Sequence, residues 1–420
     1  MLLVAHGFPP HSFGGVEQHV AGLARALLAD GHRVHVYTRT GEGEAGTLAH
    51  DVVDGLALTR VAYRFEDVRT LPDLYRSAML DAAFARFLSE AGPFDVAHVH
   101  HLTGLSLGIV DQLRQRGVRS VLTLHDYWTI CPRGQMWHRR GEVCAQVEPA
   151  RCSECLAVPF GHLLGAEPAA TLARLHDDAR ATLRAVDALV VPSARALPPF
   201  AALGLDTATV RVVENAVDVE HLAAVPPLAR RPRGQPLRVG FLGTLIPSKG
   251  LDVLVDALQR LPAGAATLDV WGNAVPYHGD EGFLTRVFSR LRPEDRVVYH
   301  GPYHTHDLAR ILTPLDCVVA PALWAEAFGL TVREALAAGR PALVSQIGGL
   351  ADAVRHEVDG FVLPPGDRAA LARALARLAT EPDLAARFGA AGRGRPRPFD
   401  TMARDLVAIY RHETSVSEQA

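Results

Sequence analysis

Residues 316–349, DCVVAPALWAEAFGLTVREALAAGRPALVSQIGG, constrain the fold of this chain more than any other stretch. Residues 316–321 form a short apolar run of the length of a buried parallel strand, and 342–345 form a second one. Between them the sequence predicts a loop and then a helix that starts near Gly329. Gly339 and Pro341 are expected to end this helix just before the second strand. This order of elements is typical of an α/β fold with a parallel sheet.

The loop of this stretch, 322–328, is expected at the sheet edge where open α/β folds bind ligands. Free backbone N–H groups at the start of the following helix suit an anionic or hydroxyl-rich ligand. These groups belong to Phe328, Gly329 and Leu330. Glu326 in the loop and Glu334 on the helix each offer a carboxylate to sugar hydroxyls, so the pair fits a ligand with two hydroxylated rings. The structural alternative is that Glu326 caps the helix and Glu334 is a solvated helix residue.

Composition sets the class of protein. A chain of 420 residues with 48% apolar and 21% charged residues is ordinary for a globular protein and long enough for two domains. A net charge of −3 lacks the basic excess of nucleic-acid-binding proteins, so no nucleic-acid partner is expected. No apolar run approaches the ~20 residues of a membrane span, and the N-terminus does not read as a signal peptide. We therefore expect a cytoplasmic protein with free or metal-bound cysteines.

Lys249 is the only lysine among the 43 basic residues, and the other 42 are arginine. In so arginine-rich a chain, a retained lysine indicates a position where a compact ammonium is needed and a planar guanidinium does not fit. The alternative is that Lys249 is a chance survivor of compositional drift.

The N-terminal part of the chain begins as a βαβ unit. Residues 2–6 and 33–38 read as strands, and the helix between them carries apolar residues at helical spacing. Its first loop ends in Gly14 and Gly15 at the helix N-terminus, where the phosphates of a ligand can approach the backbone. The spacing is not G-x-G-x-x-G, so a nicotinamide cofactor is not expected.

Three histidines stand out in the next strands. His98 and His100 lie two residues apart on one strand face, a spacing that metal sites use, but the nearby sequence supplies no further ligand. His125 follows a buried strand and is expected at the ligand-binding edge of the sheet.

The α/β alternation restarts after a Pro- and Arg-rich segment. We therefore predict an N-terminal Rossmann-like domain over 1–221, a linker over 222–236 and a C-terminal Rossmann-like domain over 237–395. Residues 396–420 hold a last amphipathic helix and a polar tail, which is expected to be disordered from Glu413.

Four of the five cysteines fall within 129–160, where the α/β alternation is interrupted. They are Cys131, Cys144, Cys152 and Cys155. The last two form a C-x-x-C pair, expected in a tight turn, and the segment has too little apolar content for its own core. We predict that the four thiolates bind one structural zinc ion that folds a small insertion. Four free thiols, an iron–sulfur cluster and disulfides are the alternatives.

In several segments the chain resembles the group-1, family-4-like glycosyltransferases. These enzymes are retaining, use nucleotide sugars and have the GT-B fold. The matching segments are FPPHSFGGVEQHVAGLARAL with GHRVHVYT, the strand-end THD, ENAVD, FLGTLIPSKG and, most specifically, E-A-F-G-L-x(3)-E-A-L-A-A-G-R-P. The resemblance covers nearly the whole chain. It implies two Rossmann-like domains facing across a deep cleft, with the C-terminal helix crossing back to the N-terminal domain.

The resemblance also assigns roles. It implies that the loop of Gly14 and Gly15 places the Gly15 N–H against the donor diphosphate, and that Lys249 holds this diphosphate as it leaves. His125 would lie beneath the transferred sugar near the anomeric carbon. Glu334 would hold the donor ribose. Glu326 would hold the hydroxyls of the transferred sugar together with three backbone N–H groups, those of Phe328, Gly329 and Leu330.

The implied reaction moves a hexosyl-type sugar from a UDP- or GDP-sugar to an acceptor hydroxyl with retention and without a metal for transfer. The acceptor is left open as a glycan, a lipid-linked sugar or a small molecule, with peripheral membrane association as a further option. One departure is Thr244, which stands where the family often has a phosphate-binding arginine. The alternatives are a sugar-nucleotide-binding regulatory or scaffold protein on the same fold, and a GT-B epimerase or phosphorylase.

Overall fold

The computed structural model describes residues 1–412 of the chain, so the prediction of a disordered tail from Glu413 lies outside the described residues. The chain divides into two compact units. Unit 1 holds 1–136, 144–216 and the segment from Phe399, and unit 2 holds 137–143 and 217–398. Within the described residues, no helix has both the length and the apolar character needed to cross a membrane.

Unit 1 is an α/β layer structure around one eight-stranded sheet. Its strands are β1 (Leu2–Ala5), β2 (His35–Thr40), β3 (Leu48–Val53), β4 (Leu56–Ala62), β5 (Val96–Val99), β6 (Arg119–Thr123), β9 (Ala188–Val191) and β10 (Arg211–Val212). Its helices are α1 (Gly15–Ala29), α2 (Ala78–Ala91), α3 (Gly108–Gln115), α4 (Pro149–Phe160), α5 (Pro168–Ala185), α6 (Pro198–Ala202) and α15 (Phe399–Tyr410).

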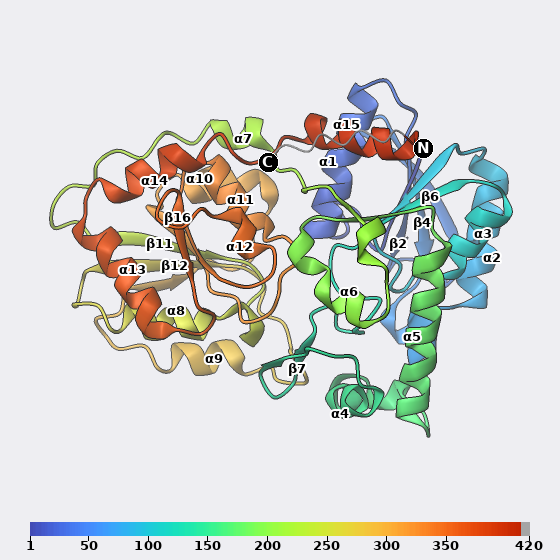
Figure 1. Cartoon of the computed structure of the whole chain (residues 1–420), viewed down its shortest axis with the longest axis horizontal. Coiled ribbons are helices and arrows are strands. Elements are labelled where there is room, and N and C mark those ends of the chain that lie inside the picture. The colour runs from blue at the N-terminus through green and yellow to red at the C-terminus, as the bar shows by residue number, and fades with distance from the viewer. Residues whose placement is uncertain (413–420) are drawn as a thin grey trace. The chain divides into compact units, whose positions relative to one another are not determined.

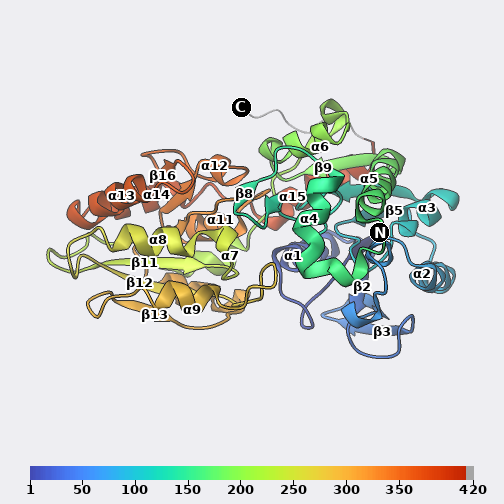
Figure 2. The same ribbon diagram turned by 90° about the horizontal axis from the view of Figure 1, so that it is seen from below.

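The strand order of this sheet is β10-β9-β6-β5-β1-β2-β4-β3. All neighbours pair in parallel except β3, which runs antiparallel to β4. Figure 2 shows β3 at the edge of unit 1. The order reverses at β1, because the chain continues to β2 on one side and later returns to β5 on the other. In doubly wound sheets, ligands bind beyond the carboxyl ends of the strands at such a reversal.

Helix α15 is part of the core of unit 1 and lies beside α1 (Figure 1). Its residues Met402, Leu406 and Ile409 are buried against α1 and the first strands. Gly22 of α1 permits this contact, because a Cβ atom there would lie 2.2 Å from the ring of Phe399. The expected return of the C-terminal helix to the N-terminal domain is therefore confirmed.

Unit 2 contains a second parallel sheet, with strand order β13-β12-β11-β14-β15-β16, and a separate two-stranded sheet of β7 and β8. The strands are β7 (Trp137–His138), β8 (Glu142–Val143), β11 (Leu237–Leu242), β12 (Ala266–Trp271), β13 (Val297–Tyr299), β14 (Cys317–Ala320), β15 (Ala342–Ser345) and β16 (Gly360–Leu363). The helices are α7 (Val219–Ala223), α8 (Leu251–Leu258), α9 (Phe283–Phe288), α10 (Leu308–Leu312), α11 (Leu330–Ala337), α12 (Leu350–Ala353), α13 (Arg368–Thr380) and α14 (Leu384–Gly392).

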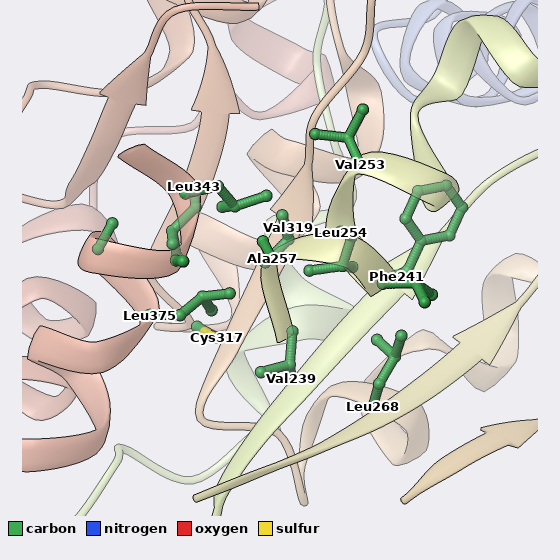
Figure 3. Close-up of a cluster of buried hydrophobic side chains, with 14 of the residues drawn as sticks. Val239, Phe241, Val253, Leu254, Ala257, Leu268, Cys317, Val319, Leu343 and Leu375 are labelled. Carbon is green, nitrogen blue, oxygen red and sulfur yellow. The ribbon is translucent and has the colours of Figure 1, made fainter. Parts of the chain in front are cut away.

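The buried strands of unit 2 send alternate side chains to opposite faces of the sheet. On β14, Cys317 and Val319 pack with α8 and α13 in one core cluster, and Val318 packs with α10 and α11 in another. Figure 1 shows α8 and α9 on one side of β11 and β12, and α10 and α11 on the other. Figure 3 shows Cys317 among the aliphatic side chains of the first cluster, which confirms the expectation of an ordinary buried thiol.

The expected linker segment, 222–236, begins within α7 and is anchored by two arginines, Arg231 of the segment itself and Arg340 from another part of unit 2. The Arg231 guanidinium donates to the carbonyl oxygens of Leu378 and Ala379 at 2.7 and 2.6 Å. Near the start of the segment, the carbonyl of Pro226 accepts from the buried Arg340 side chain at 3.1 Å. Hydrogen bonds from two arginine side chains to backbone carbonyls thus hold residues 226–231 against the rest of unit 2.

The segment 129–160 differs from the sequence prediction in one respect. The Cys152-x-x-Cys155 pair does not lie in a tight turn, because both residues belong to helix α4. Pro149 at the first helical position favours this helix start, and the Cys152 N–H donates to the Glu148 carbonyl at 2.8 Å. The two cysteines are three residues apart on the helix, so their side chains still share one face.

Candidate functional site

The sheet order of unit 2 reverses between β11 and β14, and the strongest sequence candidates lie in the loops that follow these two strands. Lys249 ends the loop after β11, and Glu326 lies in the loop after β14. The Lys249 Nζ atom lies 2.7 Å from Glu326 Oε1, a charge-assisted hydrogen bond between two largely buried side chains. The sequence assigned these residues to different parts of a ligand, and the structure places them in contact.

The two loops are also joined through their backbones. The Leu323 N–H donates to the Ser248 carbonyl at 2.8 Å. Gly250, directly after Lys249, has φ 74° and no room for a side chain, since a Cβ atom would lie 2.2 Å from the Pro321 carbonyl oxygen. Glycine is required here for both conformation and space. The ammonium group of Lys249 is therefore held by a rigid turn and not by a free loop.

The N-terminus of α11 forms the third side of this site. Gly329 precedes the helix with φ 78°, which confirms the predicted helix start. The backbone N–H groups of Phe328, Gly329 and Leu330 have no hydrogen-bond acceptor within residues 1–412. They can bind an oxygen-rich ligand, and the helix dipole favours a negative one.

A glycine pair closes the loop of Glu326 from behind. The Gly349 N–H donates to the Glu326 carbonyl at 2.7 Å. A Cβ atom on Gly348 would lie 2.3 Å from the same carbonyl oxygen. The QIGG sequence after β15 thus supports the loop, a role that sequence reasoning missed.

Glu334 lies on α11 with only 7% of its surface exposed. Burial raises the pKa of its carboxyl to about 7. The alternative of a solvated helix residue is therefore wrong. A buried carboxyl with a perturbed pKa is typical of functional sites, where a ligand supplies the missing partners.

Thr244 follows β11 and is partly exposed. Its carbonyl accepts from the Ile246 N–H at 3.1 Å, which folds the turn that leads to Lys249. The side chain adds no charge, so the only cation that this loop, 243–250, offers to a phosphate is Lys249.

In unit 1, Gly14 and Gly15 lie at the start of α1 as predicted. The carboxylate of Glu17 occupies the space beside Gly14, where a Cβ atom would lie 2.3 Å from Glu17 Oε2. Glu17 accepts from the Ser12 hydroxyl at 2.6 Å and lies 3.5 Å from His6 Nε2. This buried acidic group opposes an anion at the same helix N-terminus.

His125 follows β6 and joins a group of histidines beyond the carboxyl ends of the central strands. Its Nε2 atom is hydrogen-bonded to His100 Nδ1 at 3.0 Å, and its Nδ1 lies 3.5 Å from the Asn215 amide. The ring of His19, from α1, lies 4.6 Å from the His125 ring. Burial lowers the pKa of His19 to about 3 and holds the pKa values of His100 and His125 well below the ordinary value, so all three are neutral near pH 7.

His98 does not pair with His100 as a ligand set. Both of its ring nitrogens are used within the core, one by the Tyr410 hydroxyl and one by the Thr123 hydroxyl, each at 2.7 Å. The His98 ring lies 4.0 Å from the His100 ring, but the potential ligand atoms grouped with His100 are those of His19 on α1 and His125 after β6.

The four cysteines lie together in unit 1 and form no disulfide. Burial raises the pKa of Cys144 to about 12 and that of Cys152 to about 11, and the neighbouring thiols Cys131 and Cys155 add to both shifts. Within residues 1–412, however, the four sulfur atoms do not all lie within 4.8 Å of one another.

Two family descriptions match the chain. Residues 13–221 match glycosyltransferase family 4, and residues 229–395 match glycosyl transferases group 1. The chain is similar to a glycogen synthase of Mycobacterium tuberculosis, with 28% identity over 98% of this chain and 94% of that protein.

Solved structures share the fold. A sucrose-phosphate synthase from Thermosynechococcus elongatus superposes with a TM-score of 0.73 at 22% identity, over 99% of both chains. An Anabaena protein solved in complex with UDP-glucose superposes with a TM-score of 0.66 at 16% identity, over 98% of this chain and 99% of that one. With two Rossmann-like units and both halves matched, the chain belongs to the group-1 glycosyltransferases of the GT-B fold.

Proposed function

We propose that this glycosyltransferase moves a hexosyl-type sugar from a nucleoside-diphosphate sugar to an acceptor hydroxyl, with retention of anomeric configuration and without a metal for transfer. Unit 2 binds the donor in this proposal, and unit 1 supplies the acceptor side. The observation that carries it is the contact of Lys249 with Glu326 beside three unpaired backbone N–H groups. One cation, one anion and a row of donors are what a sugar joined to a diphosphate requires.

The donor contacts follow from this geometry. Lys249 binds the diphosphate and stabilises the negative charge that develops as it leaves. Glu326 and the N–H groups of Phe328, Gly329 and Leu330 bind the hydroxyls of the transferred sugar. Glu334, buried on the same helix, accepts from the ribose hydroxyls.

Unit 1 is proposed to act near the anomeric carbon. The pKa of His125 is held well below its ordinary value by desolvation, so this half-buried residue offers a hydrogen-bonding ring to the transferred sugar without adding charge. Gly15 can donate its backbone N–H to the diphosphate. Because Glu17 lies at the same helix N-terminus and Thr244 carries no charge, we assign most of the diphosphate binding to Lys249.

The proposed transfer needs no general base from the protein. The bond between the anomeric carbon and the diphosphate oxygen breaks, and the acceptor oxygen forms its bond on the same face of the sugar. The acceptor hydroxyl gives its proton to the departing diphosphate. Water must be kept away while this happens, since it would compete with the acceptor.

The alternatives are weaker on specific grounds. A regulatory protein on this fold does not require Lys249, Glu326 and Glu334 together, and all three are present. A phosphorylase needs a lysine that carries its cofactor, and the only lysine of this chain is engaged with Glu326.

The donor class can be tested by thermal unfolding with UDP-, GDP- and dTDP-sugars. A donor that binds the native state raises the midpoint by mass action. The neighbour solved with UDP-glucose makes UDP-glucose the first donor to try. The names of glycogen synthase and sucrose-phosphate synthase imply different products, so acceptors are screened as glycans, lipid-linked sugars and small molecules with the donor identified.

Three results would test the chemistry. The anomeric configuration of the product, measured by NMR, should match that of the donor, and the rate should survive chelation with EDTA. Donor binding without transfer to any acceptor would favour the regulatory alternative. A product of inverted configuration would contradict the mechanism.

We also propose that Cys131, Cys144, Cys152 and Cys155 bind one structural zinc ion and that the chain acts in the cytoplasm. None of the four thiols forms a disulfide in the described part of the chain, and each of Cys144 and Cys152 lies close enough to the others to affect its pKa. Zinc would draw the sulfurs closer than they are without it and stabilise a segment with little apolar content.

Metal analysis of untagged protein should find a zinc ion that is lost when Cys152 and Cys155 are both replaced by serine. The control is Cys317→Ser, whose thiol lies in the core of unit 2. A preparation without metal and with an ordered 129–160 segment would refute the cysteine site.

A further inference from the structure

Three histidines meet in unit 1 beyond the reversal point of its sheet. His19 comes from α1, His100 follows β5 and His125 follows β6. One ring nitrogen of each lies within 4.8 Å of those of the other two. Across residues 1–412, no other set of three or more histidine, cysteine or acidic residues meets this condition.

The hydrogen bonding of this set is incomplete. His19 is only 3% exposed, yet neither of its ring nitrogens has a hydrogen-bond partner. His100 is fully buried, and its Nε2 has no partner either. Buried polar atoms in proteins are almost always hydrogen-bonded, so a buried ring with two unpaired nitrogens indicates a missing partner. His98, with both ring nitrogens paired, shows that this region can satisfy a buried histidine.

The spacing suits a metal ion. His100 Nδ1 and His125 Nε2 are 3.0 Å apart. Two nitrogens bound to one tetrahedral zinc at their usual bond length lie about 3.3 Å apart. The two rings therefore need to move little to bind one ion, and His19 supplies a third nitrogen from the neighbouring helix.

We propose that His19, His100 and His125 form a binding site for Zn²⁺ or a similar divalent transition metal. Three imidazole ligands with a fourth position for water are a usual arrangement for zinc, whereas Mg²⁺ and Ca²⁺ prefer oxygen ligands. The site is separate from the cysteine set, and it shares His125 with the role proposed for sugar transfer.

Asn215 completes the site as a positioning residue. Its side chain lies 3.5 Å from His125 Nδ1, the nitrogen that would not face the metal. With the amide oxygen turned to this nitrogen, Asn215 accepts from His125 Nδ1–H and fixes which nitrogen binds the ion.

The test is a titration of untagged, metal-free protein with Co²⁺, followed by visible absorption. A site with imidazole ligands gives the d–d bands of tetrahedral Co²⁺ without the sulfur charge-transfer band that cysteine ligands add. Zn²⁺ should abolish these bands by competition. The double variant Cys152→Ser with Cys155→Ser should keep them, which separates this site from the cysteines.

His19→Gln should weaken Co²⁺ binding by more than about 100-fold. Replacing a residue that only hydrogen-bonds to a metal-binding side chain already costs about 10- to 100-fold in metal affinity, and His19 would bind the metal itself. His98→Gln is the matched control, since it changes a buried histidine of the same region that has no place in the set. If His19→Gln does not fold, Asn215→Ala should weaken binding about 10-fold or more. Absence of the d–d bands, or bands unchanged in these variants, would overturn the proposal.

Discussion

The reversal points of the two sheets occupy the same place in two related folds, and their chemistry is opposite. In unit 2 the loops after β11 and β14 bring a cation and an anion to 2.7 Å. In unit 1 the ends of β5 and β6 and the helix α1 present neutral histidine rings, and two of these histidines, His19 and His100, have ring nitrogens without partners. The same architecture thus gives one charged site that is internally paired and one neutral site in which only His100 and His125 are paired with each other.

This difference indicates how each site responds to a ligand. Lys249 and Glu326 satisfy each other, so a diphosphate must compete with Glu326 for the ammonium group. The released carboxylate is then free for sugar hydroxyls, which couples binding of the two parts of the donor. The histidines of unit 1 have no such internal competitor, and they gain hydrogen bonds or a metal ion without losing a charged partner.

The largest effect is expected from Lys249→Ala. Loss of the only cation in its loop should reduce kcat/KM by about 10²- to 10³-fold, as for loss of a donor that stabilises developing charge. Lys249→Arg should also be impaired, because the planar guanidinium is bulkier than the compact ammonium group. Initial rates and unfolding midpoints of these variants should be compared with Arg286→Ala, which removes an exposed cation of the same unit. Near-normal rates for Lys249→Ala would remove this lysine from the mechanism.

The two glutamates should separate in their kinetics. Glu326→Gln should mainly lower kcat, by about 2 kcal/mol in transition-state stabilisation, because it orients the reacting sugar. Glu334→Ala should mainly raise KM for the donor, because the ribose contact is alike in ground and transition states. Steady-state kinetics against the donor distinguish the two. Unchanged donor affinity in Glu334→Ala would show that the ribose role is wrong.

Glu334 should also make donor binding depend on pH. With a pKa of about 7, its carboxyl is mostly protonated at pH 6 and mostly ionised at pH 8. Only the ionised form accepts from both ribose hydroxyls, so donor affinity should rise with pH. Between these two values the ionised fraction changes about tenfold, which sets the upper limit of the effect. Calorimetry with wild type and Glu334→Gln checks this, and an equal pH dependence in both would contradict the assignment.

The sequence predicted the charged site far better than the neutral one. The strand–loop–helix pattern around Glu326 is a local sequence signal, and the helix start at Gly329 follows from it. The single lysine is a second local signal. What the sequence could not show is that Lys249 contacts Glu326, since 77 residues separate them. That contact depends on the order of the strands, which fixes which loops are neighbours.

The histidine group gives no local signal at all. His19, His100 and His125 come from three separate segments, and only the strand order brings them together. The sequence shows that His98 and His100 share a strand face, but the side-chain period of a strand does not say what covers that face. Glu17 could have been recognised, since an acidic residue in the first turn after a double glycine bears directly on phosphate binding.

The smallest effect is expected from His125, and it tests the neutral site directly. Replacing its ring with asparagine should lower kcat by about threefold to tenfold, the value of one hydrogen bond to an uncharged partner. A charged imidazole would contribute more, so a loss of several hundredfold would contradict the neutral form that burial favours. His176→Asn is the control, because it changes another buried histidine of unit 1, one that is hydrogen-bonded to the Ile130 carbonyl. Added Zn²⁺ should reduce the rate of wild type and have less effect on His125→Asn, because the ion and the sugar would compete for the same ring.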